Sequence, residues 1–435
     1  MSRIIKTFAW LLLGLSLSPA YASEYLELTD FHLIDGTGAN ERWVKRLIAR
    51  DGVIVSIDQQ GEVPKPEADA RWTRIGLNGA WVMPGLIDTH VHVARFPDRA
   101  RVQGILQASV RGGVTGVRDL AGDARALAEL ERSMGANEFI GPELVFSALF
   151  GGPDIFREGP TAEMAPGKPP GEAAWARSIT VETDLVRAIA EAKGSGATNI
   201  KVYGDLSPSL AAAIISEAKR QGLMTTAHAT VFSARPGDLV NAGIGSLAHA
   251  PYLVWEAVDV VPTDYRERTK GPWKQLPADH PKLLALYKDM AARGVYLDAT
   301  LYIYKAMKNF SPEVKADWTD EAFAWAAKAT RLANEAGVPV TTGTDWFEPS
   351  RDGELPHTHE ELALLVEVAG FTPMQAILAG TRNGAGALGK GRTHGTVEVS
   401  KVADLLVLEA SPLLDIRNTT RIRMTIRQGH TVSPY

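Results

Sequence analysis

Short apolar runs separated by amphipathic segments fill the middle of the chain, from Trp81 to about Gly389. The first run, Trp81–Ile87, predicts a buried strand, and similar runs recur at intervals long enough for a helix between them. Ser207 and Pro208 are typical of a helix start, as an N-cap and a first-turn proline. The other strands are predicted at Val114–Val117, Glu143–Ser147, Asn199–Val202, Met224–Ala227, Ile244–Leu247, Val295–Leu297 and Val338–Thr342.

Eight strands that alternate with helices predict an α/β fold, a (β/α)8 TIM barrel. The alternative is an open, doubly wound sheet. That fold commonly carries a G-x-G-x-x-G loop after a strand, and the sequence has no such motif after a predicted strand. The pattern therefore favours the barrel.

Both ends of the chain predict β-structure. Arg46–Arg50 and Val53–Ile57 flank Asp51 and Gly52, and a two-residue Asp-Gly loop is a hairpin signal. We therefore expect a small β-sandwich domain made of residues 23–83 and 390–435, with the barrel, residues 84–389, inserted between them. The strands predicted near the carboxyl end are Gly395–Val399, Ala403–Leu408 and Arg421–Arg427.

Residues 1–22 have the pattern of a secretory signal peptide. Arg3 and Lys6 precede an apolar run, Thr7–Leu17, and Ala20-Tyr21-Ala22 offers a small-x-small cleavage site. The run is too short to span a bilayer. We expect a secreted or periplasmic protein that begins near Ser23 and has no membrane attachment after signal cleavage.

Composition narrows the classes of partner. The formal net charge is −5, and the sequence has no basic cluster suited to nucleic acid or anionic lipid. The chain has no cysteine, which excludes disulfides and thiolate metal ligands. We therefore expect a small-molecule partner, and a homo-oligomeric assembly is left open.

Titratable side chains recur at the ends of the predicted strands. Two histidines at i and i+2 after the first strand point to the same side of an extended chain. Active sites of (β/α)8 barrels lie at the carboxyl ends of the strands, so these side chains are expected to meet there. Imidazoles and carboxylates are common metal ligands. The candidates are His90, His92, Lys201, His228, His249 and Asp345.

The sequence resembles the amidohydrolase superfamily, and within it the imidazolonepropionase-like group that includes metal-dependent Xaa-Pro dipeptidases. The resemblance extends over nearly the whole chain after the signal peptide. The matching strings are Pro84-Gly-Leu-Ile-Asp-Thr-His-Val-His92, Gly113-Val-Thr-Gly-Val-Arg-Asp119, Ile200-Lys-Val-Tyr203, Thr226-Ala-His-Ala229, Leu247-Ala-His249, Gly343-Thr-Asp345, His359-Glu-Glu-Leu362 and Val402-Ala-Asp-Leu-Leu-Val407.

This resemblance implies two divalent metal ions. His90, His92 and Asp345 would hold one ion, and His228 with His249 would hold the other. Lys201 would bridge them as a carbamate formed with carbon dioxide. Because the donors are nitrogen and oxygen, zinc is the expected metal, with manganese, iron and cobalt left open.

The implied reaction is hydrolysis of an amide (C–N) bond, in a dipeptide or an N-acyl amino acid. Two metals roughly 3.5–4 Å apart would hold a bridging hydroxide and polarise the scissile carbonyl. Asp345 would take the proton of the hydroxide and pass it to the leaving nitrogen. Tyr203 and Arg118 are the candidates for binding a substrate carboxylate.

Two features bear on the substrate. The dipeptidases of the family commonly carry a histidine after strand three, and this chain has Phe150-Gly-Gly-Pro-Asp154 there instead. The long segments Gly151–Ser178 and Trp255–His280 are predicted to be lids over the barrel mouth. The alternative functions are a mononuclear cyclic-amide hydrolase or deaminase, as imidazolonepropionase is, and a catalytically inactive binding homologue.

Overall fold

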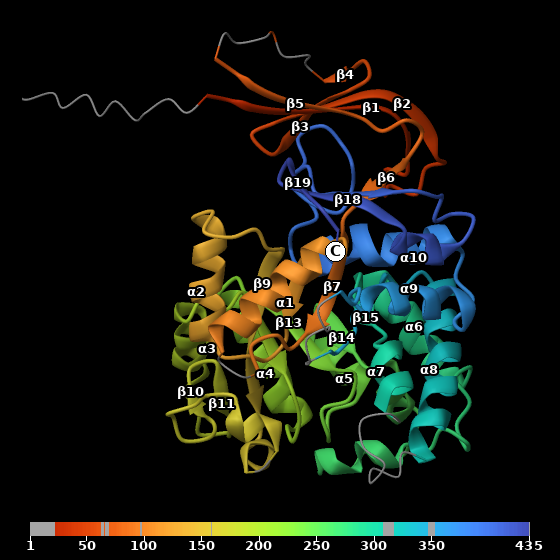
Figure 1. Ribbon diagram of the computed structural model, residues 1–435. Coiled ribbons are helices and arrows are strands. Elements are labelled where there is room, and N and C mark those ends of the chain that lie inside the picture. The colour runs from red at the N-terminus through yellow and green to blue at the C-terminus, as the bar shows by residue number, and fades with distance from the viewer. Residues whose placement is uncertain are drawn as a thin grey trace, which may run out of the picture.

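The structure, a computed structural model, describes residues 22–61, 65, 69–95, 98–157, 159–307, 317–346 and 353–434. The predicted signal peptide, apart from Ala22, lies outside the described residues. Figure 1 shows a helical barrel with a layer of strands, formed by the two ends of the chain, across one end of it. Among the described helices, none is long and apolar enough to cross a membrane.

Eight parallel strands form the barrel within the described part of the chain. Hydrogen bonds from β7 to the segment after β16 close the ring, among them Thr89 N to Thr342 O at 2.8 Å and Asp345 N to His90 O at 2.8 Å. The TIM-barrel prediction is therefore confirmed. The strands are β7 (Leu86–Val91), β8 (Val114–Asp119), β9 (Glu143–Gly151), β12 (Asn199–Val202), β13 (Met224–His228), β14 (Ser246–Ala248), β15 (Tyr296–Asp298) and β16 (Val340–Thr341).

Helices surround the barrel, because each buries an apolar stripe against the strands. In α4, for example, Ile214 and Ala218 are fully buried, and the Ser207 hydroxyl caps the first turn as predicted. The helices are α1 (Arg99–Arg111), α2 (Ala124–Gly135), α3 (Leu185–Gly194), α4 (Pro208–Arg220), α5 (Pro236–Ala242), α6 (Pro281–Arg293), α7 (Leu301–Ala306), α8 (Asp317–Glu335), α9 (Thr358–Glu367), α10 (Pro373–Leu378) and α11 (Gly384–Ala387).

The two chain ends share a separate mixed sheet with its own apolar core, as predicted for the terminal β-domain. β6 lies between β1 and β17, and it joins the strands of the amino end to those of the carboxyl end. The strands are β1 (Glu24–Leu33), β2 (Arg42–Arg50), β3 (Val53–Ile57), β4 (Gln60–Gly61), β5 (Arg71–Gly76), β6 (Trp81–Pro84), β17 (Leu405–Leu408), β18 (Ile422–Arg427) and β19 (His430–Val432).

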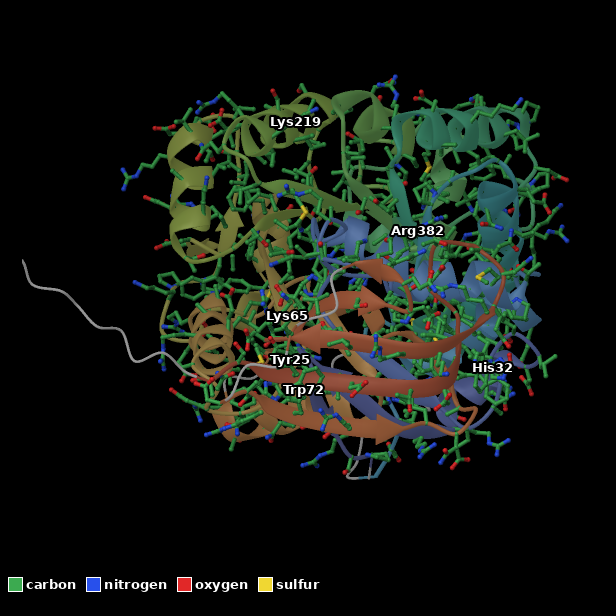
Figure 2. All side chains as sticks on the ribbon, turned by 90° about the horizontal axis from the view of Figure 1, so that it is seen from above. Tyr25, His32, Lys65, Trp72, Lys219 and Arg382 are labelled. Carbon is green, nitrogen blue, oxygen red and sulfur yellow. The ribbon has the colours of Figure 1, made fainter. Side chains whose placement is uncertain are left out.

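The predicted hairpin at Asp51 and Gly52 is confirmed, since β2 and β3 pair antiparallel across it and both residues have positive φ. Tyr25 and Trp72, which pair on β1 and β5, stack at 4.4 Å between ring centroids and lie side by side in Figure 2. The strand predicted at Gly395–Val399 is wrong, because this segment has turn and irregular backbone.

The predicted strand Trp81–Ile87 is two strands in two sheets. β6 ends at Pro84, and β7 begins at Leu86. Gly85 N donates to Asp404 O in the terminal sheet, whereas the next amide, Leu86 N, donates to Gly113 O beside the barrel strand β8. A Cβ at Gly85 would collide with the side chain of Thr115, so the chain passes between the sheets at a residue without a side chain.

Candidate metal centre and active site

The six predicted metal-ligand residues line one cavity of about 270 Å³. His90 lies at the end of β7, and His92 is one residue beyond it. Lys201 lies within β12, His228 ends β13, and His249 directly follows β14. Asp345 comes four residues after the end of β16. The structure therefore brings all six together at the carboxyl ends of the barrel strands.

Asp345 is the centre of the cluster. Its Oδ1 lies 3.2 Å from Nε2 of His90 and 3.0 Å from Nε2 of His92, and its Oδ2 lies 3.9 Å from Nδ1 of His249. One ligand atom from each of His90, His249 and Asp345 falls within 4.8 Å of the others. These atoms converge as they would around a metal ion.

A carboxylate on the side away from the cavity fixes the orientation of the His90 ring. Its Nδ1 lies 2.9 Å from Oδ2 of Asp298, a fully buried carboxylate at the end of β15, so Nε2 faces the cavity. Such a carboxylate–imidazole pair fixes the ring tautomer and orientation in metal sites. Gly343 leaves room for this carboxylate, because a Cβ there would collide with Asp298. In the same way, Nδ1 of His249 lies 3.1 Å from the hydroxyl of Thr300.

Two of the buried side-chain nitrogens at the cavity are without a hydrogen-bond partner among the described residues. They are Nζ of Lys201 and Nδ1 of His228, in side chains that are 1% and 3% exposed. Burial lowers the pKa of Lys201 to about 7, and it lowers the pKa of His228 well below its ordinary value. Buried polar groups in proteins are almost always paired. Two unpaired groups facing one cavity therefore indicate the place of a ligand.

The protonation states suit metal binding. Burial lowers the pKa of His90 well below its ordinary value and that of His249 to about 3, which leaves both imidazoles neutral. Burial alone would raise the pKa of Asp345, but His90, His92 and His249 outweigh it and hold that pKa well below its ordinary value. The neutral imidazoles of His90 and His249, the carboxylate of Asp345 and the neutral fraction of Lys201 form a nitrogen and oxygen donor set that fits divalent cations.

The backbone at this end of the barrel is unusual. His249, Thr300 and Asp345 have φ values of 70°, 52° and 53°, in the left-handed region that non-glycine residues seldom adopt. All three follow the carboxyl ends of barrel strands. Such conformations gather at functional sites, where the surrounding structure holds side chains in place at a cost in backbone energy.

The two candidates for substrate binding lie in different surroundings. Tyr203 lines the cavity, and its ring lies 4.3 Å from that of His228. Arg118 does not line this cavity. Its Nε donates to Thr89 O at 2.8 Å and its Nη1 to Ala387 O at 3.0 Å, and the side chain is 1% exposed. Nη2 of Arg118 is buried without a hydrogen-bond partner among the described residues, and the role of Arg118 in substrate binding stays a prediction.

The sequence interpretation did not name several residues that complete the cavity wall. Part of this wall comes from the two segments predicted as lids. The first contains the short 3-10 helices η1 (Pro153–Phe156) and η2 (Pro160–Glu163), and the second contains η4 (Tyr265–Lys270) and the end of η3 (Ala250–Glu256). The length and the aromatic content of these segments were the available signals. The added residues include Arg95, Thr161, Met164, Tyr252, Tyr265, Arg268, Tyr304 and Met307.

Comparison with known proteins agrees with this geometry. An ochratoxinase of Aspergillus niger is 27% identical over 423 residues, which cover 85% of this chain and 78% of the relative. An imidazolonepropionase of Pseudomonas savastanoi pv. phaseolicola is 26% identical over 412 residues, which cover 85% of this chain and 88% of the relative. The crystal structure of an Xaa-Pro dipeptidase with bound methionine superposes with a TM-score of 0.71 at 18% identity, over 95% of this chain and 100% of that one.

The family assignment rests on a longer match. The sequence model of the amidohydrolase family matches residues 81–432, which include every barrel strand and every candidate ligand. The chain therefore belongs to the amidohydrolase family, enzymes that hydrolyse carbon–nitrogen bonds.

Proposed function

We propose that this protein is an exported amidohydrolase that uses two divalent metal ions to cleave the amide bond of a dipeptide or an N-acyl amino acid. The observation that carries the proposal is the pair of unpaired buried nitrogens, Lys201 Nζ and His228 Nδ1, beside the cluster of His90, His249 and Asp345. A site for one metal ion would need the cluster alone. The additional nitrogens supply donors for a second ion.

The residues divide into two ligand groups with one bridge. His90, His92 and Asp345 would hold one ion, and His228 with His249 would hold the other, with Lys201 between the groups. When bound, the ions supply Lewis-acid polarisation of the scissile carbonyl and lower the pKa of a water molecule so that it becomes a nucleophile at neutral pH. Zinc is the metal that this nitrogen and oxygen donor set favours.

Lys201 is suited to become a carbamate. Only the neutral amine reacts with carbon dioxide, and burial lowers the pKa of Lys201 to about 7, so a substantial fraction is neutral near pH 7. The amine nitrogen bonds to the carbon of carbon dioxide and releases one proton. The product is an anion with two oxygens, which exchanges a charge that repels cations for one that binds them.

Asp345 is the proposed proton carrier. Its pKa lies well below the ordinary value, so it is ionised and able to accept a proton from the attacking water. It would then return this proton to the leaving nitrogen. Nε2 of His90 and of His92 lie 3.2 and 3.0 Å from Oδ1 of Asp345, which places the carboxylate within the ligand group that would hold the first ion.

The substrate class and the location rest on further support. An Xaa-Pro dipeptidase and a putative prolidase of Bifidobacterium longum share this fold, which favours a dipeptide or a similarly small amide. Export is proposed from the signal-peptide pattern of residues 1–22. The amino-terminal sequence of the protein recovered from the periplasm or the medium would test it, with Ser23 expected as the first residue.

Metal content tests the core of the proposal. Purified protein loaded with zinc in the presence of bicarbonate is expected to hold two equivalents per chain and to hydrolyse members of a dipeptide and N-acyl amino-acid library. Lys201→Ala is expected to bind less metal and to lose activity, and a short carboxylic acid added to it should restore part of the rate. Lys219→Ala, which removes an exposed lysine of α4, is the matched control.

Each alternative function predicts a different metal content. One equivalent of metal in the active wild-type protein, with an unmodified Lys201 amine in an electron-density map, would favour the mononuclear alternative related to imidazolonepropionase. No bound metal in the folded protein would favour the inactive binding homologue.

A further inference from the structure

Part of the cavity wall is made of aromatic hydroxyls around one guanidinium. Tyr265 and Arg268 come from η4 in the second predicted lid, and Tyr252 comes from η3, just before that segment. Tyr203 and Tyr304 complete it, and all five side chains line the same cavity as the metal-ligand cluster.

Arg268 has no carboxylate partner within ion-pair distance among the described residues. Its guanidinium lies over the ring of Tyr265, 4.2 Å from the centroid, and its Nη1 donates to Tyr265 O at 3.3 Å. It also hydrogen-bonds to the hydroxyl of Tyr252. A guanidinium has five N–H donors and stays charged, so among the described residues Arg268 keeps unused donors and a charge that no carboxylate balances.

The neighbouring arginine shows what a lid residue without this role looks like. Arg266 belongs to the same 3-10 helix, its side chain is 59% exposed, and its Nη1 lies 3.8 Å from Oδ2 of Asp264. Arg268 instead is half-buried against aromatic rings. Water cannot fully solvate a half-buried charge, which favours binding of an anion by Arg268.

The distance from Arg268 to the metal-ligand cluster fits a small substrate. The ring of Tyr265 stacks on the imidazole of His228 at 5.2 Å between centroids, and it also lies under the guanidinium of Arg268. The sum of these two distances is therefore the upper limit on the separation between the guanidinium carbon and the centre of the His228 ring. In an N-acyl amino acid, the scissile carbonyl carbon and the carboxylate carbon are roughly 3–4 Å apart. A carboxylate on Arg268 thus leaves the amide beside the cluster.

We propose that Arg268, assisted by the hydroxyl of Tyr252, binds the free carboxylate of the substrate, and that the enzyme acts on amides that carry this carboxylate next to the scissile bond. The inference rests on the proposed amide hydrolysis and assigns the residues that recognise the free carboxylate shared by N-acyl amino acids and dipeptides. Leu149, Met164 and Met307 line the same cavity and suit an apolar side chain on that amino acid.

A matched pair of substrates tests the proposal. N-acetyl-L-phenylalanine and N-acetylphenethylamine differ by the carboxylate alone. The wild-type, zinc-loaded enzyme is expected to prefer the acid in kcat/KM by roughly 10- to 100-fold, the range that a charged hydrogen bond supplies. Arg268→Met should reduce this preference toward unity, Arg268→Lys should keep part of it, and Arg266→Met should keep all of it.

Binding supplies a second readout that needs no turnover. Calorimetric titration of the zinc-loaded protein with 3-phenylpropanoate and with 3-phenylpropanamide compares an acid with its neutral counterpart. We expect the acid to bind at least about tenfold more tightly to the wild type, and Arg268→Met to lose this difference with its metal content unchanged. The wild-type comparison stands even if the variant fails to fold.

The outcomes separate this inference from the proposed function. If the wild type cleaves both amides equally well, or if Arg268→Met keeps the preference for the acid, the carboxylate site is overturned while amide hydrolysis stands. If neither amide is cleaved, the titration decides. Tighter binding of the acid that depends on Arg268 supports the site, and equal binding of acid and amide overturns it.

Discussion

Both ends of the barrel bury charged side chains, and the two ends differ in how completely these side chains are paired with opposite charges. At the amino end, Arg427 holds Asp404 by two contacts of 3.0 and 2.9 Å, donates to Gly141 O at 2.9 Å and lies 3.3 Å from Glu143. Lys390 approaches the other oxygen of Glu143 at 2.5 Å. Each cation there faces an anion, and the network joins the barrel strand β9 to the strands β17 and β18 of the terminal sheet.

At the carboxyl end of the barrel, several buried charges and hydrogen-bond donors have no protein partner in the part of the chain that the structure describes. Among the described residues, Lys201 and His228 each keep a buried nitrogen without a hydrogen-bond partner, and Arg268 has no carboxylate within ion-pair distance. A buried ion pair whose members satisfy each other holds a structure together, whereas buried groups left unpaired need a ligand. Burial and charge alone do not separate the two ends, whereas ion pairing of the cations does, although Nε2 of His394 at the amino end is also buried without a hydrogen-bond partner among the described residues.

The largest effect on catalysis is expected at the carboxyl end of the barrel, the end with unpaired groups. Asp345→Asn keeps an oxygen near His90 and His92 but cannot accept a proton. We expect kcat/KM to fall roughly 100- to 10,000-fold, the range for loss of an acid–base group, while the urea midpoint stays close to that of the wild type. Steady-state kinetics and urea unfolding measure the two quantities. Near-normal turnover would contradict the assigned role.

At the amino end of the barrel, where the cations are paired, a substitution should lower stability and leave catalysis unchanged. Arg427→Met leaves Asp404 and Glu143 without their shared partner, and removing one member of a buried ion pair costs about 3–5 kcal/mol of unfolding free energy. Catalysis per folded molecule should be unchanged. Urea unfolding measures the loss, with Arg417→Met as the control, because that arginine forms an ion pair with Glu367 in which both side chains are more than 40% exposed. If Arg427→Met lost as little unfolding free energy as Arg417→Met, the contrast between the two ends of the barrel would be contradicted.

Between these extremes lies Asp298, which supports the metal-ligand cluster without lining the cavity. Asp298→Ala removes the carboxylate that orients His90, 2.9 Å away. Changes to such supporting groups lower metal affinity about 10- to 100-fold. Competition with a chelator of known affinity measures the change, and the variant should regain activity at higher metal concentration. Unaltered metal affinity would show that His90 needs no orientation by Asp298.

The sequence predicted the metal-ligand residues better than the residues that complete the cavity wall, and the reason is physical. Barrel strands place their last residues at a common rim, so His228 and Asp345 could be assigned without knowledge of side-chain packing. Arg268 could not, since its position depends on how η4 packs against Tyr252 and Tyr203, and neither periodicity nor spacing encodes such contacts. The apolar run from Trp81 did not reveal the change of sheet at Gly85, because both halves are buried.

The smallest effect should come from His394, which faces the balanced network. Its Nε2 lies 3.6 Å from Asp404 and 4.0 Å from Glu143, with Arg427 and Lys390 also nearby. Burial, together with the two cations, lowers the pKa of His394 below its ordinary value of 6.5 despite the two carboxylates. As the pH falls below 6.5, the unfolded chain therefore takes up this proton before the folded one does, and stability declines.

One such proton changes the unfolding free energy by at most about 1.4 kcal/mol per pH unit, and above pH 6.5 the contribution is constant. Replacing His394 by Gln, which does not titrate, should flatten the decline that begins as the pH falls below 6.5. Urea unfolding of the wild type and His394→Gln across this range isolates the term, because the other titrating groups are common to both proteins. Parallel curves for the two would mean that His394 is protonated as easily in the fold as outside it, and that the balanced end tolerates a further positive charge.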